Sequence, residues 1–273
     1  MSHLECGGFT SHCRRCSSCR LLQLLLGVTA LIFLTTGQMS AATEASAEKT
    51  STVVITGANR GIGLALAKHF HQQGFAVIGT ARKPEEAQEL KAIGVEGYQL
   101  DITDPACVES FKFELDGRQV DILLNNAGIG GHSAPELKDL DIERLKYTFN
   151  VNALGALRVI QALTPNMKMG SRKIVANMSS RMGSIQQNTG GAIGYRASKS
   201  ALNSINKSLS NEFAEQGFIF VVLHPGWVRT DMTNDRATYS TEESAQALFK
   251  VITGLSKRDN GQFYDLHGKS IAW

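Results

Sequence analysis

TVVITGANRGIG, residues 52–63, is the stretch that decides the fold. Residues 52–55 are apolar or β-branched, as expected for a strand buried on both faces of a sheet. Glycines follow with the spacing G-x-x-x-G-x-G over residues 57–63, and an apolar residue at every fourth position between 62 and 70 is typical of a helix. Residues without a Cβ let the backbone approach a pyrophosphate at a helix amino terminus. The stretch therefore predicts a dinucleotide-binding strand–turn–helix unit.

The rest of the chain repeats the alternation of strand and helix. We expect further strands at residues 75–80, 95–100, 120–124, 173–178, 218–223 and 262–266. We expect further helical segments at residues 84–93, 104–115, 141–163, 195–216 and 240–252. The alternation predicts an α/β fold over residues 51–273: a single doubly wound, parallel, seven-stranded sheet of the Rossmann type, with helices on both faces.

Residues 1–50 differ from the rest of the chain and are expected to be poorly structured. Residues 21–36 form a short apolar run behind three arginines, which is typical of a secretory signal or a signal anchor but short for a spanning helix. An alternative is that Met39 is the true initiator, in which case the run is never translated. A membrane contact is expected only if residues 21–36 are retained as an anchor.

Composition narrows the class of protein. Of the 273 residues, 42% are apolar and 19% are charged, which is enough for a large core. Three arginines in the first twenty residues supply the net charge of +3, so the near-neutral remainder argues against nucleic acid as a partner. Four of the five cysteines also precede residue 20, and Cys107 alone remains in the body. We therefore expect a protein of a reducing compartment, in the cytoplasm, without a metal site.

Two arginines indicate which dinucleotide is bound. In such sites the residue after the second strand contacts the adenosine ribose. An acidic residue there accepts hydrogen bonds from the ribose hydroxyls, whereas an arginine there binds a 2′-phosphate. Ala81-Arg82 stands at this point, and no carboxylate occurs before Glu85. Arg60 is a second cation, in the glycine turn. The sequence therefore favours NADPH over NADH.

Tyr195 and Lys199 are spaced to act together. Positions i and i+4 lie on one face of a helix, and a nearby ammonium can lower the pKa of a phenol by about 1–3 units. The spacing is equally compatible with an ordinary solvated helix face. Asn152, inside a predicted helix where asparagine is unfavourable, is either a backbone-bonding structural residue or part of a proton path.

The motifs resemble the short-chain dehydrogenase/reductase family over residues 51–273. In chain order they are Thr56-Gly57-x-x-x-Gly61-Ile62-Gly63, Asn125-Asn126-Ala127-Gly128, Asn152, Ser179-Ser180, Tyr195-x-x-x-Lys199 and Pro225-Gly226. The sequence around Tyr195 and around Pro225 is similar, more closely, to the C-factor and sniffer-type carbonyl reductases within that family.

The resemblance implies a role for each residue. Tyr195 would be the general acid, Ser180 rather than Ser179 would donate to the same carbonyl oxygen, Lys199 would hold the nicotinamide ribose and lower the phenol pKa, and Asn152 would place a water between Lys199 and solvent. The implied cofactor contacts are Gly57, Asn59, Arg60, Gly61, Ile62, Gly63, Arg82, Asp101, Ile102, Asn126, Ala127, Gly128, Tyr195, Lys199, Pro225, Gly226, Val228 and Thr230.

From these residues we expect an NADPH-dependent oxidoreductase that reduces aldehyde or ketone carbonyls by hydride transfer. The alternative is a non-catalytic NADP(H)-binding protein that signals its redox state through a partner. The substrate is expected to be a small carbonyl compound, held by residues 129–135, 181–192 and 227–239, whose loops do not identify it. A homodimer or a higher oligomer is expected by analogy.

Overall fold

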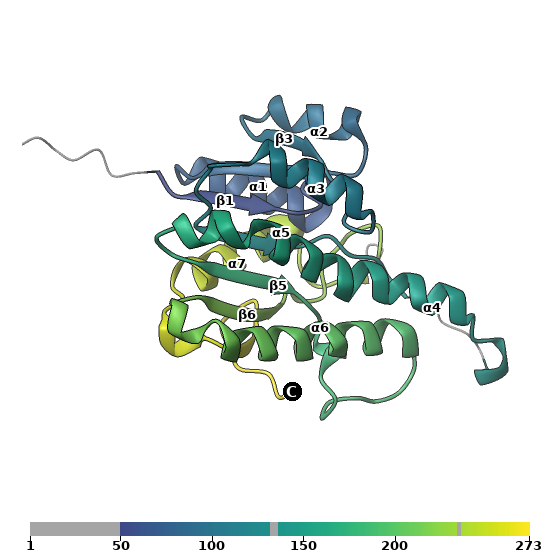
Figure 1. Ribbon diagram of the computed structural model, residues 1–273. Helices are drawn as coiled ribbons and strands as arrows, with labels where there is room; N and C mark the ends of the chain where they lie inside the picture. Colours follow the sequence, from purple (N-terminus) through teal and green to yellow (C-terminus); the bar gives the residue numbers. More distant parts are fainter. Residues whose placement is uncertain (1–49, 132–135, 234–235) are drawn as a thin grey trace, which may run out of the picture. The chain divides into compact units, whose positions relative to one another are not determined.

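β1 (Thr52–Ile55) lies inside a parallel sheet with the strand order β3-β2-β1-β4-β5-β6-β7 (Figure 1). The computed structural model describes residues 50–131, 136–233 and 236–273. Within these residues the sheet has seven strands, so the predicted doubly wound parallel fold is confirmed. The other strands are β2 (Ala76–Ala81), β3 (Glu96–Gln99), β4 (Ile122–Asn125), β5 (Ile174–Met178), β6 (Ile219–His224) and β7 (Gln262–Asp265).

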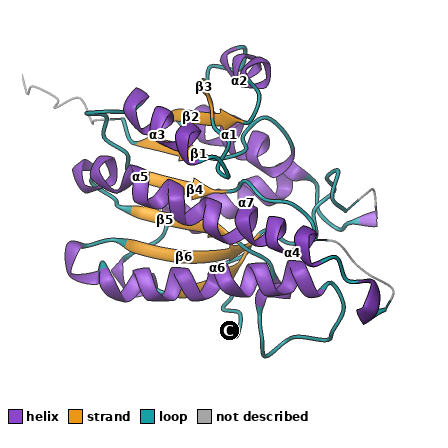
Figure 2. Ribbon diagram, turned by 45° about the vertical axis from the view of Figure 1, so that its right-hand side comes forward, coloured by secondary structure: helices purple, strands orange, loops and turns teal. Residues whose placement is uncertain are grey.

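Side chains of β1 alternate between two cores, one on each face of the sheet. Val53 and Ile55 belong to the core that α1 (Gly61–Gln72) and α7 (Thr241–Thr253) cover. Val54 belongs to the opposite core. Figure 2 shows the helices on both faces. A strand buried in this way reads as a continuous apolar run, which is why residues 52–55 could be predicted.

The remaining helices agree with the predicted segments except in one place. The helix predicted over residues 141–163 is two α-helices joined by a π-helical segment, Asn150–Gly155, and it continues to Met169. The helices are α2 (Pro84–Lys91), α3 (Pro105–Glu114), α4 (Ile142–Phe149), α5 (Ala156–Met169) and α6 (Ile193–Glu212). A π-helical segment shifts the direction of side chains without ending the helix, so apolar periodicity alone does not reveal it.

The predictions for the amino-terminal segment, including the apolar run at 21–36, lie outside the described residues. No helix among residues 50–131, 136–233 and 236–273 is both long and apolar enough to cross a bilayer.

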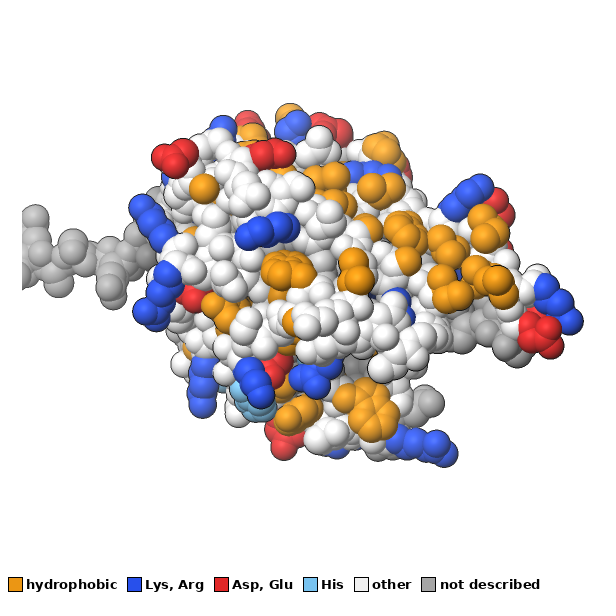
Figure 3. All heavy atoms as spheres, turned by 90° about the horizontal axis from the view of Figure 1, so that it is seen from below, with side chains coloured by type: hydrophobic (Ala, Val, Ile, Leu, Met, Phe, Trp, Pro, Cys, Tyr) orange, Lys and Arg blue, Asp and Glu red, His pale blue; other side chains and the backbone are white. Residues whose placement is uncertain are grey.

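Exposed apolar side chains occur on the long helices. Ile142, Leu154 and Ile193 are each about half exposed. Figure 3 shows one face of the molecule, on which apolar side chains gather in one part while charged side chains are scattered over the rest. Assembly through these helices stays a prediction.

Asp121 ties three chain segments together at the amino end of β4. The carboxylate is fully buried and accepts hydrogen bonds from the Thr52 amide at 2.9 Å, the Ser171 amide at 2.7 Å and the Ser171 hydroxyl at 2.8 Å. Burial alone would raise the pKa of Asp121, but these hydrogen bonds outweigh it and hold the pKa below its ordinary value. The ionised carboxylate therefore stabilises the junction of β1, β4 and β5.

Asp121→Asn should lower the free energy of unfolding at pH 7 by about 1–3 kcal/mol, because the amide cannot accept all of these bonds. Since the folded pKa is depressed, the contribution of Asp121 is present above the unfolded value of about 3.9 and disappears as the pH falls through the folded pKa. The loss in the variant should therefore shrink at acidic pH. Urea unfolding at pH 7 and at acidic pH measures this loss, with Asp116→Asn as the control because Asp116 is exposed. Equal stability of the Asp121 and Asp116 variants at pH 7 would contradict the role of Asp121.

Candidate active site

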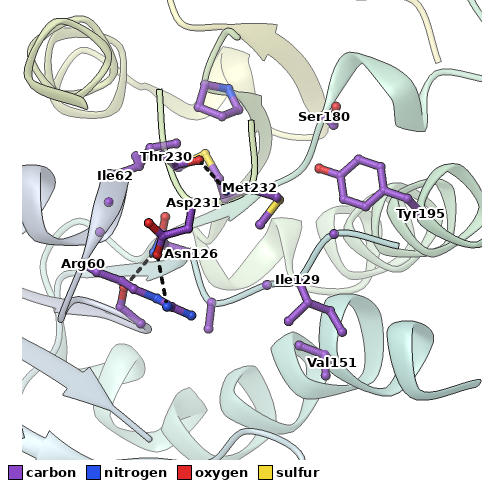
Figure 4. Close-up of a pocket in the computed structure, with 18 of the residues that line it drawn as sticks. Arg60, Ile62, Asn126, Ile129, Val151, Ser180, Tyr195, Thr230, Asp231 and Met232 are labelled. Carbon is purple, nitrogen blue, oxygen red and sulfur yellow. Dashed lines mark hydrogen bonds and ion pairs between the residues drawn. The ribbon is translucent and has the colours of Figure 1, made fainter. Parts of the chain in front are cut away.

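A cleft of about 1170 Å³ opens at the carboxyl edge of the sheet. The loops that follow β1, β2, β4, β5 and β6 line it. This is the expected place for a ligand site, because the chain adds strands in one direction from β1 to β3 and in the other direction from β4 onward. Every residue predicted to be catalytic or to bind the cofactor lines this cleft except Asn152. Figure 4 shows the cleft and the labelled side chains that enter it.

The glycine turn leaves the start of α1 open to the cleft. Gly57 has a φ of +64°, which favours glycine. A Cβ on Gly63 would lie 2.1 Å from the Gly57 carbonyl oxygen, so only glycine fits. Arg60 precedes α1 and makes no side-chain cap. The first amides of this helix are therefore available for an anion, which suits a pyrophosphate.

Asn126 fixes the distance between the glycine turn and the end of β4. Its side-chain amide donates to the carbonyl oxygens of Thr56 and Gly57, both at 3.0 Å. The Thr56 hydroxyl accepts in return from the amides of Asn126 at 3.0 Å and Ala127 at 3.1 Å. The amide side chain thus ties the turn, as predicted for a strand that ends in Asn and Gly.

The end of the cleft next to the glycine turn, where the adenosine is expected to bind, carries cations and three carboxylates. Arg60, from the glycine turn, and Arg82, after β2, both line it. Arg60 Nη1 lies 3.2 Å from Asp231 Oδ2, across the cleft, in an ion pair whose two side chains are largely exposed (Figure 4). Asn59 Nδ2 donates to Glu86 Oε2 at 3.1 Å. Asp101 Oδ1 accepts from the amide and the hydroxyl of Thr103, two residues further along the chain, so the position of this carboxylate is fixed.

Ser180 and Tyr195 come together at the other end of the cleft. Ser180 follows β5, Tyr195 stands in the first turn of α6, and the Tyr195 hydroxyl points toward Ser180 (Figure 4). Lys199, one turn along α6, is buried, and its Nζ donates to the Met178 carbonyl oxygen at 2.8 Å. The same Nζ lies 5.9 Å from the centre of the Tyr195 ring. The predicted i and i+4 pair therefore shares one face of α6.

Burial, rather than Lys199, dominates the pKa of Tyr195. Burial raises the pKa of Tyr195, and the interaction with the Ser180 hydroxyl only partly opposes it. Burial also lowers the pKa of Lys199 to about 8. Both side chains lie in the same poorly solvated space, where each charged form is disfavoured. The sequence argument counted the attraction between the two groups and omitted this burial.

The two adjacent serines after β5 have different surroundings. Ser179 Oγ donates to Asn203 Oδ1 at 2.8 Å, inside the protein. Ser180 Oγ accepts from the Met182 amide at 3.2 Å, and the Tyr195 hydroxyl points toward this residue (Figure 4). The geometry therefore places Ser180, not Ser179, next to the phenol.

Asn152 lies behind the cleft in the π-helical segment. Its side chain accepts from the Ile129 amide at 2.9 Å and donates to the Ile129 carbonyl oxygen and to Ser198 Oγ, both at 3.0 Å. It thus clamps the loop after β4 onto α6, which agrees with the structural alternative raised for it. A Cβ on Gly128 would lie 3.1 Å from Asn152 Oδ1 and 3.4 Å from Lys199 Nζ, so glycine leaves a small space beside both atoms.

Several cleft residues were missed by the sequence analysis. Arg144, Tyr147 and Val151 enter from α4 and the turn after it, and the Arg144 guanidinium lies 5.8 Å from the centre of the Tyr147 ring. Their spacing of three and four residues marks one helix face, a signal that could have been used. His224, at the end of β6, also lines the cleft, and burial with the nearby Arg181 lowers its pKa to about 4.

Three known proteins to which this chain is similar illustrate its relationships. The C-signal protein of Myxococcus xanthus is 44% identical over 155 residues, which are 56% of this chain and 93% of that protein. The carbonyl reductase Sniffer of D. melanogaster superposes with a TM-score of 0.78 at 32% identity, covering 82% of this chain and all of that one. The NADPH-bound carbonyl reductase from chicken fatty liver superposes with a TM-score of 0.75 at 33% identity, covering 82% and 99%.

The sequence pattern of the short chain dehydrogenase family matches residues 51–240. This range holds the glycine turn, Ser180, Tyr195 and the loop after β6 that lines the cleft. The chain therefore belongs to the short chain dehydrogenase family of oxidoreductases, in its C-factor and Sniffer-type branch.

Proposed function

We propose that this protein is an NADP(H)-dependent carbonyl reductase. The observation that carries the proposal is one cleft that is lined by Ser180, Tyr195 and Lys199, with the Tyr195 hydroxyl pointing toward Ser180, and also by Arg60 and Arg82 from the turns after β1 and β2. The similarity to carbonyl reductases, one of them NADPH-bound, supports the same reaction. The substrate class is a small aldehyde or ketone.

The residues of the cleft suit a nicotinamide dinucleotide. The open amino end of α1 suits the pyrophosphate, and Arg60 and Arg82 suit a 2′-phosphate. We assign Asp101 and Ile102 to the adenine. The other residues predicted to contact the cofactor also line the cleft, as does Lys199. When bound, the cofactor supplies the hydride.

Tyr195 is the group best placed to protonate a carbonyl oxygen. Because burial raises its pKa, the phenol is protonated at neutral pH, which is the form that a proton donor needs. Ser180 can donate to the same oxygen, since its side chain lies beside the Tyr195 hydroxyl and both residues line the cleft. Lys199 holds a position close to the ring through its bond to Met178.

Asn152 has capacity for one further contact in this scheme. Its Nδ2 uses both hydrogens, but its Oδ1 accepts a single bond and keeps one lone pair. The space beside Gly128 separates this oxygen from Lys199 Nζ. A water in this space would accept a hydrogen bond from Lys199 Nζ and donate one to Asn152 Oδ1. Holding this water is the role that we assign to Asn152.

Tyr195→Phe should reduce kcat for NADPH-dependent carbonyl reduction by about 10²–10⁴, because the proton donor is lost. NADPH affinity should stay within a few-fold of wild type. Ser180→Ala should reduce kcat by about 10²–10³. Ser179→Ala is the matched control and should act mainly on thermal stability, since Ser179 bonds to Asn203. Near-wild-type turnover by Tyr195→Phe would refute the assignment.

Arg82→Ala and Arg60→Ala should each weaken NADPH binding by about tenfold to a hundredfold, as expected for one charge-assisted hydrogen bond to a phosphate. NADH binding should change much less, because NADH lacks the 2′-phosphate. Fluorescence titration with both cofactors measures the ratio. Equal losses for NADPH and NADH would show that neither arginine reads the phosphate.

The kcat/KM for NADPH reports ionisations of the cofactor-free enzyme. It should fall above about pH 8, where Lys199 loses its charge. The sign follows from the lowered pKa of the ammonium: below pH 8 the group is charged and can donate to the ribose. A profile that stays flat to pH 9.5 would argue against Lys199 as a contact.

The alternative of a non-catalytic NADP(H) sensor predicts NADPH binding without turnover. The paired hydroxyls of Ser180 and Tyr195 favour the enzyme, since a sensor has no use for a proton donor. NADPH consumption with aldehydes, quinones and diketones separates the two. A cytoplasmic location and a homodimer stay predictions.

A further inference from the structure

Arg196, the residue after Tyr195, joins both ends of the loop that connects β5 to α6. Its Nε donates to the carbonyl oxygens of Gly190 at 2.9 Å and Gly191 at 3.1 Å, and Nη2 donates to Thr189 Oγ1 at 3.1 Å. Its Nη1 reaches the Met182 carbonyl oxygen, at the beginning of the loop, at 3.5 Å. One guanidinium therefore closes a loop of about ten residues at its base (Figure 1).

The end of this loop has an unusual backbone that directs carbonyls to Arg196. Gly190, Gly191 and Ala192 have φ values of +84°, +70° and +43° in succession. The Ala192 carbonyl oxygen accepts from the Arg196 amide at 3.0 Å, so three consecutive carbonyls bond to one residue. Left-handed backbone is unfavourable for alanine and persists only where surrounding contacts enforce it. The Arg196 guanidinium holds the two glycine carbonyls just before Ala192, and the backbone amide of Arg196 holds the Ala192 carbonyl.

Other groups hold the rest of the loop in place. Ser200 Oγ and Asn203 Nδ2 both donate to the Gly183 carbonyl oxygen, at 2.9 and 3.1 Å. Together with Arg196 they are spaced by four and three residues, on one face of α6. At the far side the Gln186 amide donates to the Trp273 carbonyl oxygen at 3.0 Å.

The charge of Arg196 serves only this loop. Among the described residues no carboxylate lies within 4.0 Å of its guanidinium. Arginine presents five donors in a fixed fork, so it can bond several carbonyls that a lysine could not reach at once. The Arg196 guanidinium is half-buried and donates hydrogen bonds to four oxygens of the loop, so it holds the loop closed.

The two ends of the fastened loop are part of the cleft wall. Arg181 and Met182 at its beginning and Ala192 at its end line the cleft beside Ser180 and Tyr195. Residues between them do not line the cleft. The position of this wall relative to the two hydroxyls therefore depends on how the loop is closed at its base.

We propose that Arg196 is a positioning residue that sets the substrate side of the cleft. It acts through the loop of residues 182–192 and does not contact the substrate. The proposal rests on the proposed function for its kinetic readout, because carbonyl reduction reports the substrate wall. A second readout, amide hydrogen exchange of the loop, does not depend on activity.

Arg196→Ala and Arg196→Lys are the test variants. Amides that are bonded within the loop, those of Gln187, Asn188 and Gly190, should exchange at least about tenfold faster in both variants. KM for a carbonyl compound that the wild type reduces should rise about tenfold, while kcat stays within about threefold and the pH profile is unchanged. NADPH affinity should be unchanged, because the loop does not line the adenosine end.

Two further variants sharpen the test. Arg172→Ala removes an arginine that donates to the Thr253 carbonyl oxygen, away from the cleft, and should change neither loop exchange nor KM. Ala192→Gly in the Arg196→Ala background should recover part of the KM loss, because glycine adopts the left-handed backbone without strain.

Unchanged loop exchange in the Arg196 variants, or a fall in kcat with KM unaltered, would overturn the proposal. If the wild type reduces no carbonyl compound, the proposed function fails, and loop exchange alone still decides whether Arg196 fastens the loop. Arg196→Lys retains the charge and the aliphatic stem, so it keeps the test available if Arg196→Ala does not fold.

Discussion

The hydrogen bonds of Asn126 are the constraint on which the site depends. They hold the glycine turn after β1 and the loop after β4 at a fixed separation, through the carbonyl oxygens of Thr56 and Gly57. These two strands are neighbours in the sheet, yet their chains leave it in opposite directions, which opens the cleft between them. A dinucleotide site at the amino end of α1 and a reaction site beside Lys199 then follow from one geometry.

Burial gives the reaction end its chemistry. Tyr195 and Lys199 share a space with little solvent, so burial raises the pKa of the phenol, which keeps its proton at neutral pH, and lowers the pKa of the ammonium to about 8. A donor that stays protonated suits reduction of a carbonyl. The adenosine end is different, because Arg60 and Asp231 are exposed and their ion pair is screened by water. In the proposed function, the residues that read the 2′-phosphate are therefore separate from the residue that donates the proton.

Local patterns predicted most of the fold, and non-local contacts account for the rest. The apolar run at 52–55 and the glycines after it fixed the order of elements, since they act within one short segment. The choice between Ser179 and Ser180 depended on the direction of the chain as it leaves β5, which alternation alone does not give. Pairwise charge alone predicts a lowered pKa for Tyr195, whereas burial, which the sequence pattern does not reveal, raises it. The contacts of Arg196 join residues that the sequence does not mark as neighbours, so the loop they close could not be foreseen.

The central claim is that the cleft transfers a hydride to a carbonyl carbon. Single-turnover reaction with NADPH deuterated at the transferable position, against aldehydes, ketones, quinones and diketones, tests it most directly. The account predicts one deuterium on the carbinol carbon of the product, found by mass spectrometry, with oxidation of an equal amount of cofactor. Tight binding of NADPH that is never consumed with any of these compounds would contradict the account.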